Sequence, residues 1–166
     1  MQQLLARLAA SARKNPGYKN LVVIGIRRRG AVLAQRLHDL IQKESGQTIP
    51  FGSLDISFYR DDFSNVGANP IVAGTDILFD LEGKKILLVD DVLFTGRTIR
   101  AALDALIDFG RPALVRLMVM VDRGHRELPI QADFSGTTVK ATRKQMVEVR
   151  VAELDGKDGI FLCDKP

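Results

Sequence analysis

The feature that most constrains the fold is an alternation of short apolar runs with stretches of helical periodicity. Residues 21–26 and 86–89 are apolar throughout, and residues 113–121 are apolar except for one arginine. Continuous runs of this kind are typical of strands buried on both faces of a parallel sheet. Parallel strands need crossover connections, which are usually helices. We therefore expect an α/β fold with a mostly parallel, twisted sheet and helices on both of its faces.

Three stretches carry apolar residues at helical spacing. Residues 2–14 form one stripe, and a second stripe runs from residue 31 to about residue 44, with Gly46 where a helix C-terminal glycine belongs. A third stripe covers residues 99–106 and ends at Gly110. Each of these three helices lies beside an apolar run in the sequence. The order of elements in the centre of the chain is therefore strand, helix, strand, strand, helix, strand.

Weaker patterns predict the remaining strands. Residues 51–60 alternate between apolar and polar side chains, which indicates a half-buried strand. Further short strands are expected around residues 77–80, 147–151 and 160–162. No repeat, low-complexity tract or linker interrupts the chain, so residues 1–166 are expected to form a single domain.

Composition narrows the classes of protein further. Cys163 is the only cysteine, which excludes an internal disulfide framework and a cysteine-based zinc site. No apolar run approaches the roughly 20 residues of a membrane span, so we expect a cytoplasmic protein without a membrane partner. Residues 61–91 hold two basic and seven acidic residues, whereas residues 1–60 hold ten basic and three acidic ones. This distribution indicates anionic ligands, a divalent cation site and, through the basic N-terminal part, contact with nucleic acid.

The expected sheet directs attention to four loops. In open α/β sheets, ligands bind at the carboxyl ends of the strands. The loops at those ends are residues 27–30, 60–76, 90–98 and 122–126. The second of them is long and polar, as expected of a lid over a binding site.

Two acids in the third loop are the strongest chemical signal. Asp90 and Asp91 directly follow the apolar run 86–89. Carboxylates in this position are costly unless they are satisfied, which argues against an incidental surface role. Neighbouring carboxylates at a strand end can accept hydrogen bonds from the vicinal hydroxyls of a sugar, and one of them can approach a magnesium ion.

The turn after the acids is typical of a phosphate site. Thr95, Gly96 and Thr98 surround the expected start of a helix, where free backbone N–H groups and the helix dipole bind anions. Arg97 either adds charge to this site or points to water. Neither of the common glycine-rich nucleotide motifs is present. The acids and the turn together suit a ribose that carries a phosphate.

At this point the sequence resembles a known family. Residues 86–98 are similar to the binding motif for phosphoribosyl pyrophosphate (PRPP) in type I phosphoribosyltransferases. Residues 55–62, 110–112 and 121–130 resemble the uracil phosphoribosyltransferases that also attenuate pyrimidine operons by binding RNA. This similarity extends from about residue 21 to residue 151. It implies the type I phosphoribosyltransferase fold, in which a small hood accompanies the sheet.

The resemblance also implies a reaction and a set of site residues. Uracil and PRPP would give UMP and pyrophosphate, with magnesium as cofactor. Asp90 and Asp91 would act in catalysis and hold the metal directly or through water, and Arg60 would bring charge to the pyrophosphate. The binding residues implied are Thr95, Gly96, Arg97 and Thr98 for the PRPP phosphate, Arg28, Arg29 and Gly30 for pyrophosphate, and Val121, Asp122 and Arg123 for the base.

Three functions remain open on the sequence alone. The first is an active uracil phosphoribosyltransferase, and the second is a regulator that binds a messenger RNA hairpin and uses the PRPP site to sense nucleotides. The third keeps the fold but takes a purine base, because the phosphate motif is common to many transferases. The family resemblance also implies a homo-oligomer, a dimer or larger. His125 has no assigned role, and His38 is expected to be structural.

Overall fold

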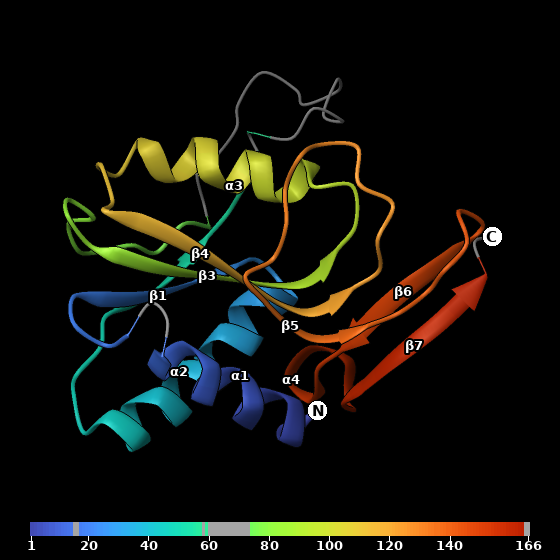
Figure 1. Cartoon of the computed structure of the whole chain (residues 1–166), viewed down its shortest axis with the longest axis horizontal. Coiled ribbons are helices and arrows are strands. Elements are labelled where there is room, and N and C mark those ends of the chain that lie inside the picture. The colour runs from blue at the N-terminus through green and yellow to red at the C-terminus, as the bar shows by residue number, and fades with distance from the viewer. Residues whose placement is uncertain (15–16, 58, 60–73, 165–166) are drawn as a thin grey trace.

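A five-stranded parallel sheet forms the centre of the structure, a computed structural model that describes residues 1–14, 17–57, 59 and 74–164 (Figure 1). The spatial order of its strands is β2-β1-β3-β4-β5. All neighbouring strands in this sheet are parallel, as the continuous apolar runs predict. The strands are β1 (Leu21–Ile26), β2 (Phe51–Leu54), β3 (Lys85–Leu93), β4 (Leu114–Asp122) and β5 (Phe134–Thr138).

Helices cover both faces of the sheet. On one face lie α1 (Gln2–Lys14) and α2 (Arg29–Ser45), and on the other lies α3 (Arg97–Ile107), as Figure 1 shows. Side chains along β1 serve the two faces in turn: Leu21 and Val23 pack with α1 and α2, whereas Val22 and Ile24 pack with α3. Both faces of the central strands are thus buried, which is the physical reason that these strands lack polar alternation.

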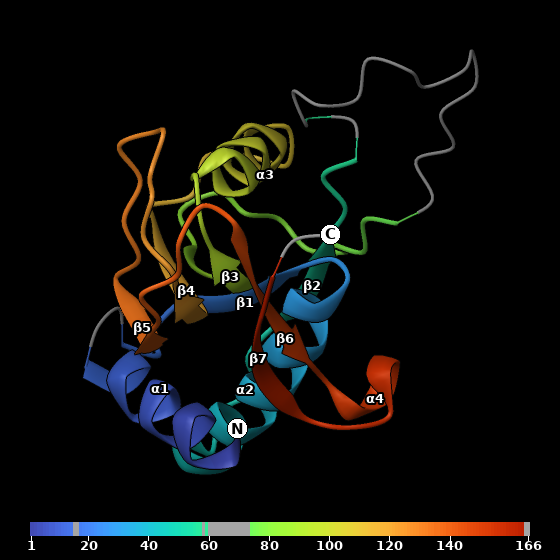
Figure 2. The ribbon, with the colours of Figure 1, turned by 90° about the vertical axis from the view of Figure 1, so that its right-hand side faces the viewer.

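The C-terminal part of the chain forms a small hood beside α2. Strands β6 (Gln145–Arg150) and β7 (Gly159–Asp164) pair in an antiparallel hairpin, and the short helix α4 (Ala152–Asp155) connects them. Figure 2 shows the hairpin and α4 alongside α2. Ion pairs from Arg29 and Arg36 on α2 to the hood residues join the two parts. The hood implied by the family resemblance is therefore built from the two weak strand signals near the C-terminus.

Three sequence predictions for strands were wrong in extent or in kind. Strand β2 ends at Leu54 rather than continuing toward residue 60, because the Asp55 carboxylate accepts the Ser57 backbone N–H at 2.9 Å and turns the chain. The strand expected at 77–80 is absent from the described residues, where only an isolated bridge joins Ser53 to Asp76. The run 86–89 extends instead to Leu93 as β3.

Two elements were missed by the sequence analysis. Strand β5 has only five residues and no apolar run, and it exists because it pairs with the exposed edge of β4. Helix α4 has four residues, too few for a periodic pattern. None of the described helices combines the length and the apolar character that crossing a lipid bilayer requires.

Candidate active site

Asp90 and Asp91 lie inside β3, not in a loop after it. The strand continues past them because Asp90, Val92 and Leu93 pair with β4. The Oδ1 atom of Asp90 accepts the Asp91 backbone N–H at 2.9 Å, and Oδ1 of Asp91 accepts the Val92 N–H at 2.8 Å. Asp90 is buried, with 5% of its surface exposed. The backbone bonds therefore fix two carboxylates near the carboxyl end of the central strand.

Burial also acts on the protonation of Asp91. Burial raises the pKa of the Asp91 carboxyl, while hydrogen bonds from the Val92 N–H and with Asp90, and the nearby charge of Arg29, act in the opposite direction. Two adjacent carboxylates near a strand end, one buried and one partly buried, favour binding of a cation or of sugar hydroxyls.

The first turn of α2 lies directly against this acidic pair. A Cβ atom on Gly30 would stand 2.9 Å from the Val89 carbonyl oxygen and 3.1 Å from Oδ1 of Asp90. Only glycine allows so close an approach between the helix and β3. The structure thus brings the sequence-predicted residues 28–30 next to the predicted acids, although about 60 residues of sequence separate them.

Arg28 is the exposed side chain of this turn. The peptide bond between Arg27 and Arg28 is cis, and Arg27 donates from Nε to the Ser53 hydroxyl at 3.0 Å. Arg28 borders two hollows, one of about 450 Å³ and one of about 130 Å³. Within the described part of the chain, no carboxylate forms an ion pair with Arg28. Its charge is therefore available to an anionic ligand.

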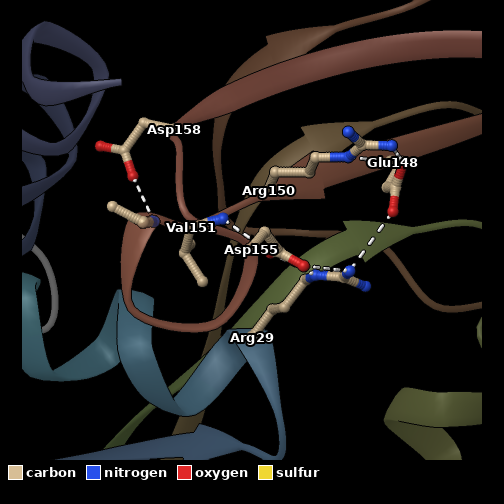
Figure 3. Close-up of polar contacts among 7 residues, drawn as sticks. Arg29, Glu148, Arg150, Val151, Asp155 and Asp158 are labelled. Atoms are coloured by element: carbon tan, nitrogen blue, oxygen red, sulfur yellow. Dashed lines mark hydrogen bonds and ion pairs between the residues drawn. The ribbon is translucent and has the colours of Figure 1, made fainter.

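Arg29 turns the other way, toward the hood (Figure 3). Its Nε and Nη2 atoms lie 3.0 and 2.7 Å from the two carboxylate oxygens of Asp155, and Nη2 also lies 3.3 Å from Glu148. The hydrogen bonds from Arg29 lower the pKa of Asp155 to about 2. This two-point contact holds the start of α2 against the hood.

The low pKa of Asp155 predicts a pH dependence of stability. An ordinary aspartate has a pKa near 3.9. Because the folded state lowers that value to about 2, the contact stabilises the fold fully above pH ~4 and is lost as the pH falls toward 2. Urea unfolding of wild type and Asp155→Asn from pH 7 to pH 3 should show a difference that is constant down to about pH 5 and then shrinks. A difference that grew toward acid pH would contradict the assignment.

The predicted phosphate turn forms the start of α3. Gly96 has φ +94° and precedes the helix, a backbone conformation that favours glycine. The Thr95 hydroxyl accepts the Arg97 backbone N–H at 3.3 Å, and the Thr95 carbonyl accepts two N–H groups from the loop after β4. Arg97 pairs with Glu127 at 2.8 Å at the surface, and Thr98 is partly buried. The turn thus joins the loop in which the base site is predicted.

At the predicted base site, the backbone groups expected to bind the base are already hydrogen-bonded within the protein. Val121 is buried, and the backbone of Asp122 and Arg123 already bonds to Val139 and Leu93. The Arg123 guanidinium lies 3.9 Å from the centre of the Phe94 ring. Arg123 is 4% exposed, and its Nε has no hydrogen-bond partner among the described residues. The Nη2 atom of Arg123 donates to the Thr142 carbonyl at 3.1 Å, so this side chain joins the turn at Phe94 to the loop before β6.

Arg126 organises this loop and was missed in the sequence. It donates to the carbonyls of Ile130 at 2.8 Å and Phe94 at 3.0 Å, and it pairs with Asp122 at 2.6 Å. It also donates to the Gly124 carbonyl at 3.3 Å, so one guanidinium joins the loop after β4 to itself and to the turn before α3, which suits its planar fork of donors. The only signal in the sequence was an arginine four residues after an aspartate, too common a pattern to single it out.

We expect Arg126→Lys to destabilise the protein by about 2 kcal/mol, because an ammonium group cannot reach all four acceptors and leaves partly buried oxygens unpaired. Urea denaturation measures the change. Arg97→Lys is the matched control, since the exposed pair of Arg97 with Glu127 contributes at most about 1 kcal/mol. Equal losses in the two variants would show that Arg126 does not organise the loop.

The other predicted residues have simpler outcomes. Arg60, and with it residues 60–73 of the predicted lid, lies outside the described residues. The His125 ring contacts the Ala141 carbonyl at 2.6 Å. His38 is buried and contacts the Ile49 carbonyl at 2.7 Å, which agrees with a structural role. In the described part of the chain, no three histidine, cysteine or acidic side chains cluster as a metal site.

These elements together define a class of protein. Two fixed carboxylates lie in the central strand of a parallel sheet, between a glycine-bearing helix start and a threonine-rich one. The family model "Phosphoribosyl transferase domain" matches residues 1–153, so the chain is a phosphoribosyltransferase-family protein. Proteins called "Bifunctional protein PyrR" resemble it over nearly their whole length. The one from Thermus aquaticus is 51% identical over 166 residues, covering 99% of this chain and 92% of the relative.

A second relative supports the same family, and two solved structures share the fold. The PyrR of Caldicellulosiruptor bescii is 50% identical over 163 residues, with 98% of this chain and 90% of the relative covered. The chain therefore belongs to the PyrR family of type I phosphoribosyltransferases. A Staphylococcus aureus hypoxanthine phosphoribosyltransferase shares its fold with a TM-score of 0.71 and 22% identity, over 99% of this chain and 88% of that one. A Pyrococcus horikoshii purine phosphoribosyltransferase shares the fold with a TM-score of 0.64 and 24% sequence identity. The match covers 84% of this chain and 83% of that one.

Proposed function

We propose that this protein is a uracil phosphoribosyltransferase, which converts uracil and PRPP to UMP and pyrophosphate. The observation that carries the proposal is that the Gly30 turn packs on Asp90 and that β3, which holds Asp90 and Asp91, leads directly into the turn of residues 95–98. The first turn offers Arg28 and a helix start to the pyrophosphate, and the second offers hydroxyls and a helix start to the 5′-phosphate. The ribose between the two phosphate groups would meet the carboxylates.

The residues suit the charges that develop in this reaction. As N1 of uracil bonds to the anomeric carbon, the bond from that carbon to the pyrophosphate oxygen breaks, and the N1 proton is released to water. The sugar gains positive charge and the leaving pyrophosphate gains negative charge. Asp90 and Asp91 would stabilise the sugar, and Arg28 would stabilise the leaving group. The protein contributes mainly position and charge.

Magnesium fits the acids as a cofactor held jointly with the substrate. Mg²⁺ in phosphate-transferring sites is commonly bound by one or two carboxylates together with phosphate oxygens and water. Asp90 and Asp91 supply that donor type near the carboxyl end of β3. The ion would neutralise charge on the pyrophosphate, and Asp91 or Asp90 would hold it directly or through water.

The base that the protein accepts decides between a uracil and a purine phosphoribosyltransferase. The base would lie near Arg123, whose guanidinium is 3.9 Å from the centre of the Phe94 ring. Uracil and hypoxanthine both carry carbonyl acceptors, so a direct comparison of the two bases is needed. The experiment is a base panel: purified protein with magnesium, PRPP and either uracil or hypoxanthine, followed by pyrophosphate release. Release with uracil alone supports the proposal. Release with hypoxanthine alone would make the protein a purine phosphoribosyltransferase.

A second function, RNA regulation, is favoured by the relatives called bifunctional that share about half of this sequence. Lys140, Arg143 and Lys144 are exposed in the loop between β5 and β6 and could contact RNA phosphates. We propose binding of a messenger RNA hairpin that responds to UMP, by a cytoplasmic homo-oligomer. Filter binding with and without UMP tests it. Tight binding should require UMP and should weaken steeply as the salt concentration rises. RNA binding that depends on neither UMP nor salt would contradict regulation.

A further inference from the structure

Two arginines on α2 attach the hood, and they do so in the same way. Arg29 and Arg36 are about two helical turns apart and therefore lie on the same side of α2. Arg29 binds Asp155 and Glu148, and Arg36 binds Glu153 and Asp158. All four carboxylates belong to the hood. The two attachments differ in place, because Arg29 is at the first residue of α2 and Arg36 is in its middle.

The contact of Arg29 is built to fix its position. The guanidinium meets both oxygens of Asp155, which gives a planar, two-point geometry. Asp155 is held in turn, because its Oδ2 accepts the Val151 backbone N–H at 2.9 Å (Figure 3). Arg150 binds the Glu148 carboxylate at 3.0 Å and completes the network. The Arg29 side chain is therefore held by two carboxylates of the hood.

Arg29 also connects this network to the acidic pair Asp90 and Asp91. Arg29 lies close enough to Asp91 for its charge to act on that carboxyl. Gly30, the next residue, packs on Val89 and Asp90. A shift of Arg29 would therefore move the turn that carries Arg28. The described residues form no ion pair with Arg28, so this side chain is the one available to pyrophosphate in the turn. Asp155 itself lies beyond residues 1–153, which the family model matches.

We propose that Asp155 is a positioning residue for pyrophosphate: by holding Arg29 against the hood, it sets the place of the turn 28–30 and of the Arg28 side chain. The inference rests on the proposed function, which supplies pyrophosphate as the ligand of this turn. UMP carries no pyrophosphate, and its phosphate belongs to the turn of residues 95–98. Loss of Asp155 therefore weakens pyrophosphate binding and leaves UMP binding unchanged.

The test compares Asp155→Asn with Glu153→Gln by calorimetry, with magnesium pyrophosphate and UMP as separate probes on the full chain. Both variants remove one hood carboxylate that binds an arginine of α2, but only the first touches the pyrophosphate turn. We expect Asp155→Asn to bind pyrophosphate about tenfold more weakly, the effect of one lost charge-assisted hydrogen bond. Its affinity for UMP, and both affinities of Glu153→Gln, should match those of wild type.

Each other result overturns the inference. Wild-type pyrophosphate affinity in Asp155→Asn would show that the hood does not position the turn. Equal loss of both ligands, or the same loss in Glu153→Gln, would indicate a general effect of hood attachment on the fold. Wild-type protein that binds neither ligand would overturn the proposed function as well, and that outcome is distinct because it does not depend on the variants.

Discussion

Asp90→Asn and Asp91→Asn should each lower the rate of UMP formation by roughly 10²- to 10³-fold, the cost of removing one preorganised electrostatic group from a transition state. The amide keeps the size of the carboxylate and an oxygen that can accept the backbone N–H of the next residue. It removes the negative charge that would face the sugar and the magnesium ion. Pyrophosphate release at saturating PRPP and uracil measures the loss.

The matched control for both variants is Asp104→Asn. Asp104 lies on α3 and pairs with Arg100 at the surface, four residues away. Its loss should leave the rate within about twofold of wild type, because exposed pairs contribute little. Thermal unfolding of all three variants separates a folding defect from a chemical one. If both acidic-pair variants kept a tenth of the wild-type rate, the carboxylates would not be the groups that act on the sugar.

Gly25→Ala should produce the largest loss of stability, about 3 kcal/mol or more, because overpacking here meets backbone rather than a mobile side chain. A Cβ on Gly25 would lie 2.5 Å from Cα of Ala31, 2.6 Å from Cβ of Ala34 and 2.7 Å from the Gly30 carbonyl oxygen. To accommodate it, α2 must move away from β1. Thermal unfolding should show a decrease in Tm of roughly 10 °C.

Gly83→Ala separates packing from backbone strain. Gly83 has φ +65° and open space around its would-be Cβ, so alanine there costs only about 1 kcal/mol of conformational energy. Gly25 has the opposite combination, with an ordinary φ and no space. The double variant Gly25→Ala/Ala34→Gly should recover part of the loss, since it removes one of the three clashes. If Gly25→Ala were no worse than Gly83→Ala, the close contact of α2 with β1 would be wrong.

Prediction from sequence succeeded where a short stretch of neighbouring residues is enough to indicate the element. The apolar runs at 21–26 and 86–89 predicted buried parallel strands, and the structure confirms them as β1 and part of β3. The turn of residues 95–98 combines glycine and hydroxyls within four positions, so its place at the start of α3 could also be predicted. Such signals depend on neighbours in the chain and need no knowledge of packing.

Prediction failed where an element exists only through a distant partner. The residues at 77–80 have strand-like composition, but among residues 1–14, 17–57, 59 and 74–164, which the structure describes, the nearest pairing is the isolated bridge of Ser53 with Asp76. Strand β5 forms without an apolar run because the edge of β4 is open to it. Pairing, more than propensity, decided both cases.

The amino-acid sequence by itself determined the parallel α/β architecture and the family, because periodicity and the motif at 86–98 are properties of neighbouring residues. Only the tertiary structure decided the direction of Arg29, the junction that Arg126 makes and the contact of Arg123 with the Phe94 ring. Arg29 meets Asp155 across more than a hundred residues. Contacts of this kind depend on the geometry with which helices and strands pack, and no local pattern in the chain encodes that geometry.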